Sequence, residues 1–151
     1  MFSYAMAKEK GLYVGIYTGA VGDEDYAQCL SSMTEFERAV RGLPDGLVAI
    51  LVTDPGVEAV PPAWRKRMAS FNDNVQASRF LLSIVTPSSL IRGILTAINW
   101  LSPARQGHQR KAHETFAEAC AWIEKIHGRS QPQLTELYHS ARSKLTLSQT
   151  G

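Results

Sequence analysis

The sequence has little of what disulfide frameworks, metal centres and membrane spans require. Its 151 residues include two cysteines, Cys29 and Cys120, and neither has a second cysteine or a histidine at metal-ligand spacing. Both fall among apolar residues of expected helices, so we expect buried, reduced thiols. Every uncharged apolar stretch is interrupted well before the roughly 18 residues that a membrane-spanning helix needs. We therefore expect no disulfide scaffold and no integral membrane segment.

Charge of one sign is also scarce, because 16 basic residues face 14 acidic ones and the net charge is only +2. The first ten residues place their charges after a short apolar start, which is the reverse of a signal peptide. This pattern favours a cytoplasmic location. Basic residues gather at 105–111, but without interleaved aromatic residues a solvated loop is favoured over a nucleic-acid contact.

Catalytic and nucleotide-binding signatures are missing as well. The four histidines show no metal spacing beyond a loose pair of His108 and His113, and no carboxylate is placed to complete a triad. Ser88 and Ser89 follow an expected strand, but without a G-x-S-x-G elbow they indicate helix caps. The chain also has no Walker motif and no G-x-G-x-x-G. We therefore expect a protein that is not an enzyme and has no cofactor or metal.

What the sequence does contain is clearest at residues 80–101. An apolar run of strand length ends at Thr86-Pro87, and a segment with helical periodicity follows from Ser88-Ser89. A strand buried on both faces, followed by a crossover helix, has this pattern. Six aliphatic residues of the helix are expected to face inward: Leu90, Ile91, Ile94, Leu95, Ile98 and Leu101.

The same alternation extends along the chain. We expect strands at 12–18, 47–52 and 80–85, with a weaker one at 109–113. Helices are expected from Asp23 as N-cap, from Pro61 or Pro62, from Ser88 or Ser89, and from the Thr115 capping box, and a last one at 134–145. Trp64, Met68, Phe71 and Val75 recur as one buried face after the second of these strands.

This order predicts an α/β fold with a mainly parallel sheet of four or five strands flanked by helices, as a single domain. Residues 1–128 form the α/β domain, and residues 129–151 form a C-terminal amphipathic helix and a frayed tail. That helix either packs on the domain or binds a partner.

Several residue patterns resemble the STAS fold (sulphate transporter and anti-sigma factor antagonist), in particular its bacterial SpoIIAA-like group. The match runs from Leu12 to Ile126 and rests on Tyr17-Thr18-Gly19 with Asp23-Glu24, Val52-Thr53-Asp54, Pro62-x-x-Arg65, Met68-Ala69-Ser70-Phe71, Pro87-Ser88-Ser89-Leu90-Ile91-Arg92-Gly93, Thr96-Ala97-Ile98-x-Trp100 and Glu118-Ala119-x-x-Trp122.

The resemblance implies a non-enzymatic bacterial signalling or scaffolding module that docks a protein partner through its helical face. Such a partner is a regulatory or scaffold protein, for example an anti-sigma-type kinase or a GTPase-linked regulator, and a homo-oligomer is a further alternative. Family members controlled by phosphorylation carry a serine where the helix after the central strand begins. Here that region reads Val60-Pro61-Pro62-Ala63-Trp64 and has no hydroxyl group. The rival function is a small-ligand or lipid-binding domain with a cavity between sheet and helices.

Two groups of residues are candidates for the partner surface. Arg65, Lys66 and Arg67 lie near the start of a helix, where cations are locally unfavourable unless an acidic partner or a phosphate docks there. The alternative is a solvated helical face.

The second group, Arg92, Thr96 and Asn99, shares one helical face opposite the aliphatic stripe, with Trp100 beside it. Arginine and tryptophan are typical anchors of protein interfaces. The alternative is that this face covers a neighbouring element and that Arg92 binds a backbone carbonyl.

Overall fold

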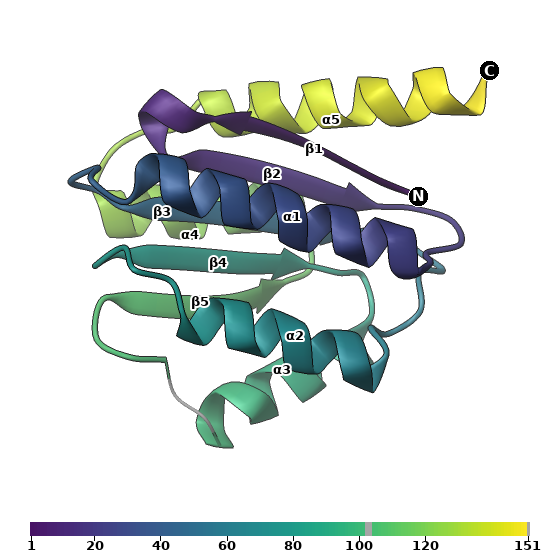
Figure 1. The fold of residues 1–151 in the computed structure, drawn as a ribbon, viewed down its shortest axis with the longest axis horizontal. Coiled ribbons are helices and arrows are strands. Elements are labelled where there is room, and N and C mark those ends of the chain that lie inside the picture. Colours follow the sequence, from purple (N-terminus) through teal and green to yellow (C-terminus); the bar gives the residue numbers. More distant parts are fainter. Residues whose placement is uncertain (102–103, 151) are drawn as a thin grey trace.

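A five-stranded mixed sheet forms the centre of the described part of the chain. The computed structural model describes the backbone of residues 1–101 and 104–150, and the side chains of residues 1–97 and 104–150. The strands are β1 (Phe2–Ala7), β2 (Leu12–Tyr17), β3 (Leu47–Thr53), β4 (Phe80–Val85) and β5 (His108–His113), and they lie in the order β1-β2-β3-β4-β5. β1 is antiparallel to β2, and the other neighbours are parallel (Figure 1).

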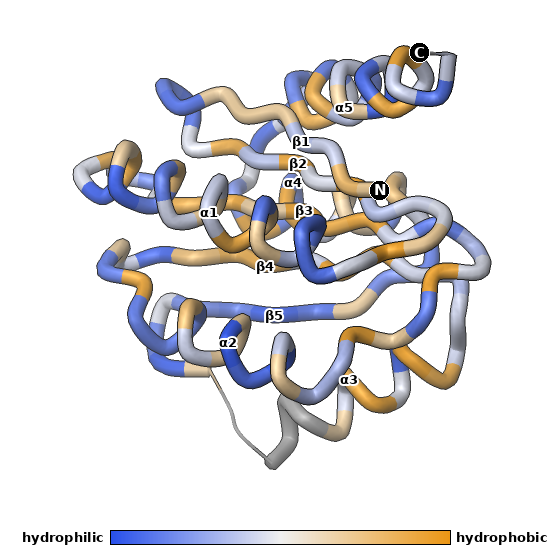
Figure 2. Tube along the Cα trace, turned by 45° about the vertical axis from the view of Figure 1, so that its right-hand side comes forward, coloured by the Kyte–Doolittle hydropathy of each residue, from blue (hydrophilic) through white to orange (hydrophobic). Residues whose placement is uncertain are grey.

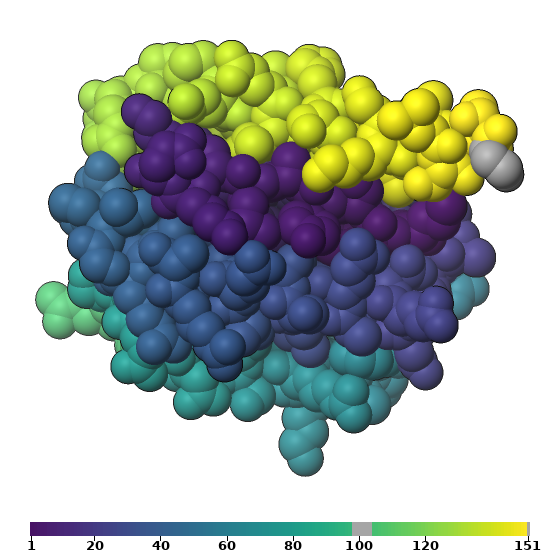
Figure 3. Space-filling model, turned by 45° about the horizontal axis from the view of Figure 1, so that its top comes forward, coloured from purple at the N-terminus to yellow at the C-terminus, as the bar shows by residue number. Residues whose placement is uncertain are grey.

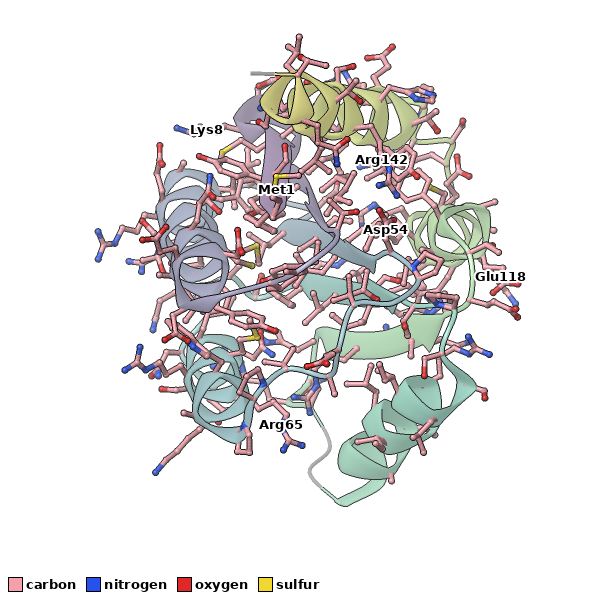
Figure 4. The ribbon with its side chains drawn as sticks, turned by 90° about the vertical axis from the view of Figure 1, so that its right-hand side faces the viewer. Met1, Lys8, Asp54, Arg65, Glu118 and Arg142 are labelled. Atoms are coloured by element: carbon pink, nitrogen blue, oxygen red, sulfur yellow. The ribbon has the colours of Figure 1, made fainter. Side chains whose placement is uncertain are left out.

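Helices cover both faces of this sheet. α1 (Asp23–Val40) and α2 (Pro62–Asp73) pack on one face, while α4 (Phe116–His127) and α5 (Gln133–Gln149) pack on the other. α3 (Ser89–Leu101) lies beyond β5, at the edge of the sheet, rather than over the centre of either face (Figure 4). A short 3-10 turn, Lys8–Lys10, joins β1 to β2.

The alternation of side chains along β2 divides the core into two layers. Tyr13 and Tyr17 face α1 and α2, and Val14 and Ile16 face α4 and α5. Gly15 lies between the two tyrosines, and a Cβ there would meet the ring of Phe2 at 2.9 Å. The ring of Phe2, on β1, therefore occupies the space that a side chain at Gly15 would need.

The expected α/β architecture and the expected strands are confirmed, and β5 begins one residue earlier than predicted. β1 was not among the expected strands, and its two alanines are residues of low strand propensity. Asp23 is not the N-cap that the sequence indicated. Gly22 takes that position, and the Asp25 carboxylate accepts a hydrogen bond from its N–H at 2.9 Å.

The inward stripe predicted for α3 is wrong at two positions. Leu90 is 72% exposed and Ile94 is 41% exposed, while Ile91 and Leu95 are half-buried. Ile98 and Leu101 lie outside the residues whose side chains are described. Because α3 lies at the sheet edge, it covers β5 with one side only (Figure 2).

The apolar face expected on α2 is only half-buried. Trp64, Met68 and Phe71 pack against the core but keep partial exposure, and no residue of α2 is fully buried. Val75 is buried, but it follows the helix, which ends at Asp73.

The last helix packs on the sheet. The sequence left open whether this helix packs on the domain or binds a partner, and the structure shows the first of these arrangements. Leu134, Ala141 and Leu145 are buried in the layer formed by β2, β3 and α4. α5 runs beside β1 along the edge of the molecule (Figure 3). It extends to Gln149, four residues beyond the predicted end.

Candidate functional site

An exposed apolar strip on α3 is the most unusual surface of the described chain. Leu90, Gly93, Ile94 and Ala97 follow one another at i, i+3, i+4 and i+7, and all four are exposed. This spacing places them on one side of the helix. Such a strip is what one helix presents to another when the two pack together. We call these four residues the α3 strip.

The opposite side of α3 is fastened to the ends of the neighbouring strands. Ser88 caps the helix by accepting a hydrogen bond from the Ile91 N–H at 3.2 Å, as the sequence predicted. Arg92 Nη1 donates to the Thr86 carbonyl at 2.7 Å, and its other terminal nitrogen lies 3.9 Å from a carboxylate oxygen of Glu114. These contacts fix the orientation of the helix, so the α3 strip points away from the sheet.

Of the four residues on this helix that the sequence proposed for a partner surface, the structure describes the side chains of two, Arg92 and Thr96. Arg92 is engaged within the chain, through the backbone carbonyl that one of the two alternatives invoked. Thr96 is exposed, and its hydroxyl donates to the Arg92 carbonyl at 2.9 Å. Asn99 and Trp100 lie outside the residues whose side chains are described. A partner role for this face stays a prediction.

Three consecutive basic residues of α2 are exposed: Arg65, Lys66 and Arg67. Within the described ranges, none of them lies within salt-bridge distance of a carboxylate. The guanidinium carbon of Arg67 stands 4.6 Å from the centre of the Trp64 ring, a cation–π contact. Arg65 extends from α2 toward the side of the molecule where α3 lies (Figure 4).

The start of α2 is itself anchored to α1. The indole N–H of Trp64 donates to a carboxylate oxygen of Asp23 at 2.7 Å, and the Trp64 ring lies 5.6 Å from the Tyr26 ring. The tryptophan therefore positions the basic residues that follow it. Neither the Asp23 contact nor the uncovered α3 strip follows from periodicity, because both depend on which element lies opposite.

Other reactive groups in the described chain are poorly placed for catalysis. Burial raises the pKa of the Cys29 thiol to about 11, although the hydroxyl groups of Tyr17 and Tyr13 oppose the shift. His113 Nδ1 and Ser83 Oγ lie 2.7 Å apart, a pair that the sequence analysis missed, but both residues are buried and Ser83 is inaccessible to a substrate. No group of three potential metal ligands occurs among the described residues.

Two hollows lie on the surface of the described chain, outside the space between the sheet and its helices. One follows the outer side of α1 near Lys8, and the other lies where the loop after β1 meets the start of α5. Arg129 contacts Asp45 at the second hollow. These hollows do not have the position that the rival ligand-binding function requires.

One signal for the exposed strip was present in the sequence. Leu90 and Ile94 are each followed directly by a second aliphatic residue, Ile91 and Leu95, so the apolar stripe is wider than one packing face. Successive helical residues are about 100° apart, and a helix at a sheet edge buries only one side.

Comparison with known proteins supports the fold. A crystal structure of an uncharacterised DUF3478-family protein with a SpoIIAA-like fold, from Shewanella loihica PV-4, aligns with a TM-score of 0.51 and 17% identity, over 82% of this chain and 92% of that chain. The expected SpoIIAA-like fold is thereby confirmed. No protein-family model matches the sequence, and no match was found among curated proteins. Among the described residues, no helix combines the length and the hydropathy of a membrane-spanning segment.

Proposed function

We propose that this SpoIIAA-like domain is a non-enzymatic module for bacterial signalling or complex assembly that docks a protein partner through the α3 strip. The observation that carries the proposal is the exposure of Leu90 and Ile94 on a helix otherwise fastened to the body. Large apolar side chains that share an exposed helical side typically mark a binding surface. A single exposed leucine would not indicate a binding surface.

The neighbouring charges support a protein partner of acidic character. Arg65, Lys66 and Arg67 have no carboxylate partner among the described residues, and they begin a helix whose N-terminal end is already electropositive. An acidic partner would gain from both charge sources, and its association would weaken with salt.

The test is affinity capture from native lysate with three tagged chains: wild type, Leu90→Glu and Leu147→Glu. Leu147 lies on α5 and is also 72% exposed, so its substitution controls for a charge added at an exposed leucine. We expect a stoichiometric protein with the wild type and with Leu147→Glu, and its loss with Leu90→Glu. Both substitutions should leave the melting temperature nearly unchanged, because neither leucine is packed.

Two outcomes would contradict the proposal. A partner retained equally by Leu90→Glu would show that the α3 strip is not the docking surface. Mass spectrometry of the eluate that finds a stoichiometric lipid or metabolite and no protein would favour the rival function, a small-ligand or lipid-binding domain.

A further inference from the structure

We infer that the partner presents an amphipathic helix, with an apolar stripe that packs on the α3 strip and acidic residues along the flank that faces α2. This inference rests on the proposed function and adds the chemistry of the partner.

The shape of the α3 strip suits a helix. Gly93 and Ala97 stand between and beside the two large residues, Leu90 and Ile94, so the strip alternates large and small side chains. A Cβ added at Gly93 would meet nothing within 4 Å, so the helix surface is open at this glycine. Small residues let two helix backbones approach closely, while the large ones enter the grooves of the partner.

The charges around the α3 strip indicate which residues the flank of the partner helix would carry. Arg92 is the single charged residue of α3, and it is bound to the Thr86 carbonyl on the side of the helix that faces the strand ends. The strip itself is therefore uncharged. Arg65 is one of the three exposed cations of α2, and in Figure 4 it extends toward the side of the molecule where α3 lies. Acidic residues on one flank of a docked helix would lie opposite these cations.

A lipid surface fits the strip less well than a helix does. Helices that lie on membranes combine several large apolar residues with lysines and arginines on their own polar face. The described part of the strip has only two large apolar residues, and α3 has no second basic residue. A glycine at position 93 adds nothing to membrane insertion but lets the backbone of a second helix approach closely.

The experiment uses two labelled synthetic helical peptides with the same leucine stripe, one with glutamates and one with lysines along the flank. Binding to the full chain is measured by fluorescence anisotropy at low and high salt. We expect the acidic peptide to bind about tenfold more tightly at low salt, and this advantage to fall as salt screens the charges. Changing Arg65, Lys66 and Arg67 together to Glu should remove the advantage. Leu147→Glu should have no effect.

Gly93→Leu separates helix packing from simple apolar attraction. The substitution adds bulk at a position where a Cβ would meet nothing within 4 Å, so the fold should tolerate it. If two helices pack closely, the variant binds the acidic peptide less tightly. Sedimentation with vesicles of phosphatidylglycerol and phosphatidylcholine gives the opposite expectation, because an added leucine would strengthen insertion into a membrane.

The outcomes distinguish the inference from the proposed function. If Leu90→Glu abolishes native capture but the two peptides bind equally, the docking function holds and the acidic-helix inference is overturned. Vesicle binding that is lost with Leu90→Glu and strengthened by Gly93→Leu would overturn the inference in favour of a lipid surface. Unaltered capture by Leu90→Glu would contradict both the docking function and the acidic-helix inference.

Discussion

Arg142 on α5 binds Asp54 at the end of β3 through two hydrogen bonds, one of them 2.6 Å long, across 88 positions of sequence. The two-pronged geometry is the strongest arrangement that an arginine and a carboxylate can adopt. Arg142 also donates to the Tyr138 hydroxyl at 3.0 Å. The last helix is thereby fastened to the end of a central strand.

We expect Arg142→Met to lower the free energy of unfolding by about 1–3 kcal/mol, because the partly buried Asp54 carboxylate loses its charged donors. Urea denaturation measures the change. Arg129→Met is the matched control. Arg129 contacts Asp45 at an exposed site, where such pairs contribute at most about 1 kcal/mol. Equal losses in the two variants would contradict a special role for the Asp54 pair.

The same pair predicts a dependence of stability on pH. Hydrogen bonding from Arg142 lowers the pKa of Asp54, although burial opposes the shift. A carboxyl with a lowered pKa stabilises the fold above its unfolded value of about 4, and this stabilisation is lost as pH falls through the folded pKa. The stability difference between wild type and Asp54→Asn should therefore be largest near pH 7 and shrink below about pH 4. A difference that stays constant to pH 2 would contradict the assignment.

His113 predicts a second loss of stability at mildly acidic pH. Burial lowers its pKa, and Nε2 has no hydrogen-bond partner within the described residues. The unfolded chain therefore takes up a proton more readily than the folded chain, so stability falls as pH drops below about 6.5. His113→Gln should flatten the stability profile between about pH 7 and 5. An unchanged slope in this variant would assign the effect to another group.

The packing of α5 predicts unequal effects for two leucines of the same helix. Leu134 is fully buried, whereas Leu147 is 72% exposed. Leu134→Ala should cost about 2–5 kcal/mol of unfolding free energy, because it removes buried methyl groups and leaves a cavity. Leu147→Ala should cost less than about 0.5 kcal/mol. Similar melting temperatures for the two variants would show that α5 does not pack on the sheet in solution.

Two glycines with similar φ angles should differ in how well they tolerate substitution by alanine. Gly46 has a φ of 70° and Gly19 a φ of 63°. A Cβ at Gly46 would lie 2.0 Å from the Arg79 carbonyl oxygen, whereas one at Gly19 would meet nothing within 4 Å. Both alanine variants strain the backbone by about 1–2 kcal/mol, but Gly46→Ala should also displace the loop before β4. Equal melting temperatures would contradict the close approach.

Much of the architecture was predictable because local periodicity reports which residues a segment buries. The apolar run of β3 and the helical spacing in α1 each identified an element without knowledge of its neighbours. The Ser88 cap was predictable for the same reason, since the hydroxyl and the N–H that it binds are three residues apart.

The candidate site was predictable only in part. The basic residues 65–67 were visible as a charge run, and the structure adds that they are exposed and that Arg67 stacks on Trp64. The width of the aliphatic stripe on α3 indicated more apolar surface than one packing face needs, but the exposure of the α3 strip was not predictable, because the pattern is the same whether or not a second element covers it. The predicted burial of Leu90 and Ile94 failed for that reason.

The sequence by itself determined the alternation of strands and helices, the layered α/β class and the scarcity of catalytic groups, because each depends on residues close together in the chain. Only the tertiary structure decided that β1 joins β2, that Arg142 meets Asp54, and that α3 lies beyond the edge strand. These features join distant segments. A side chain is buried only where another segment packs against it, and the local sequence does not specify which segment that is.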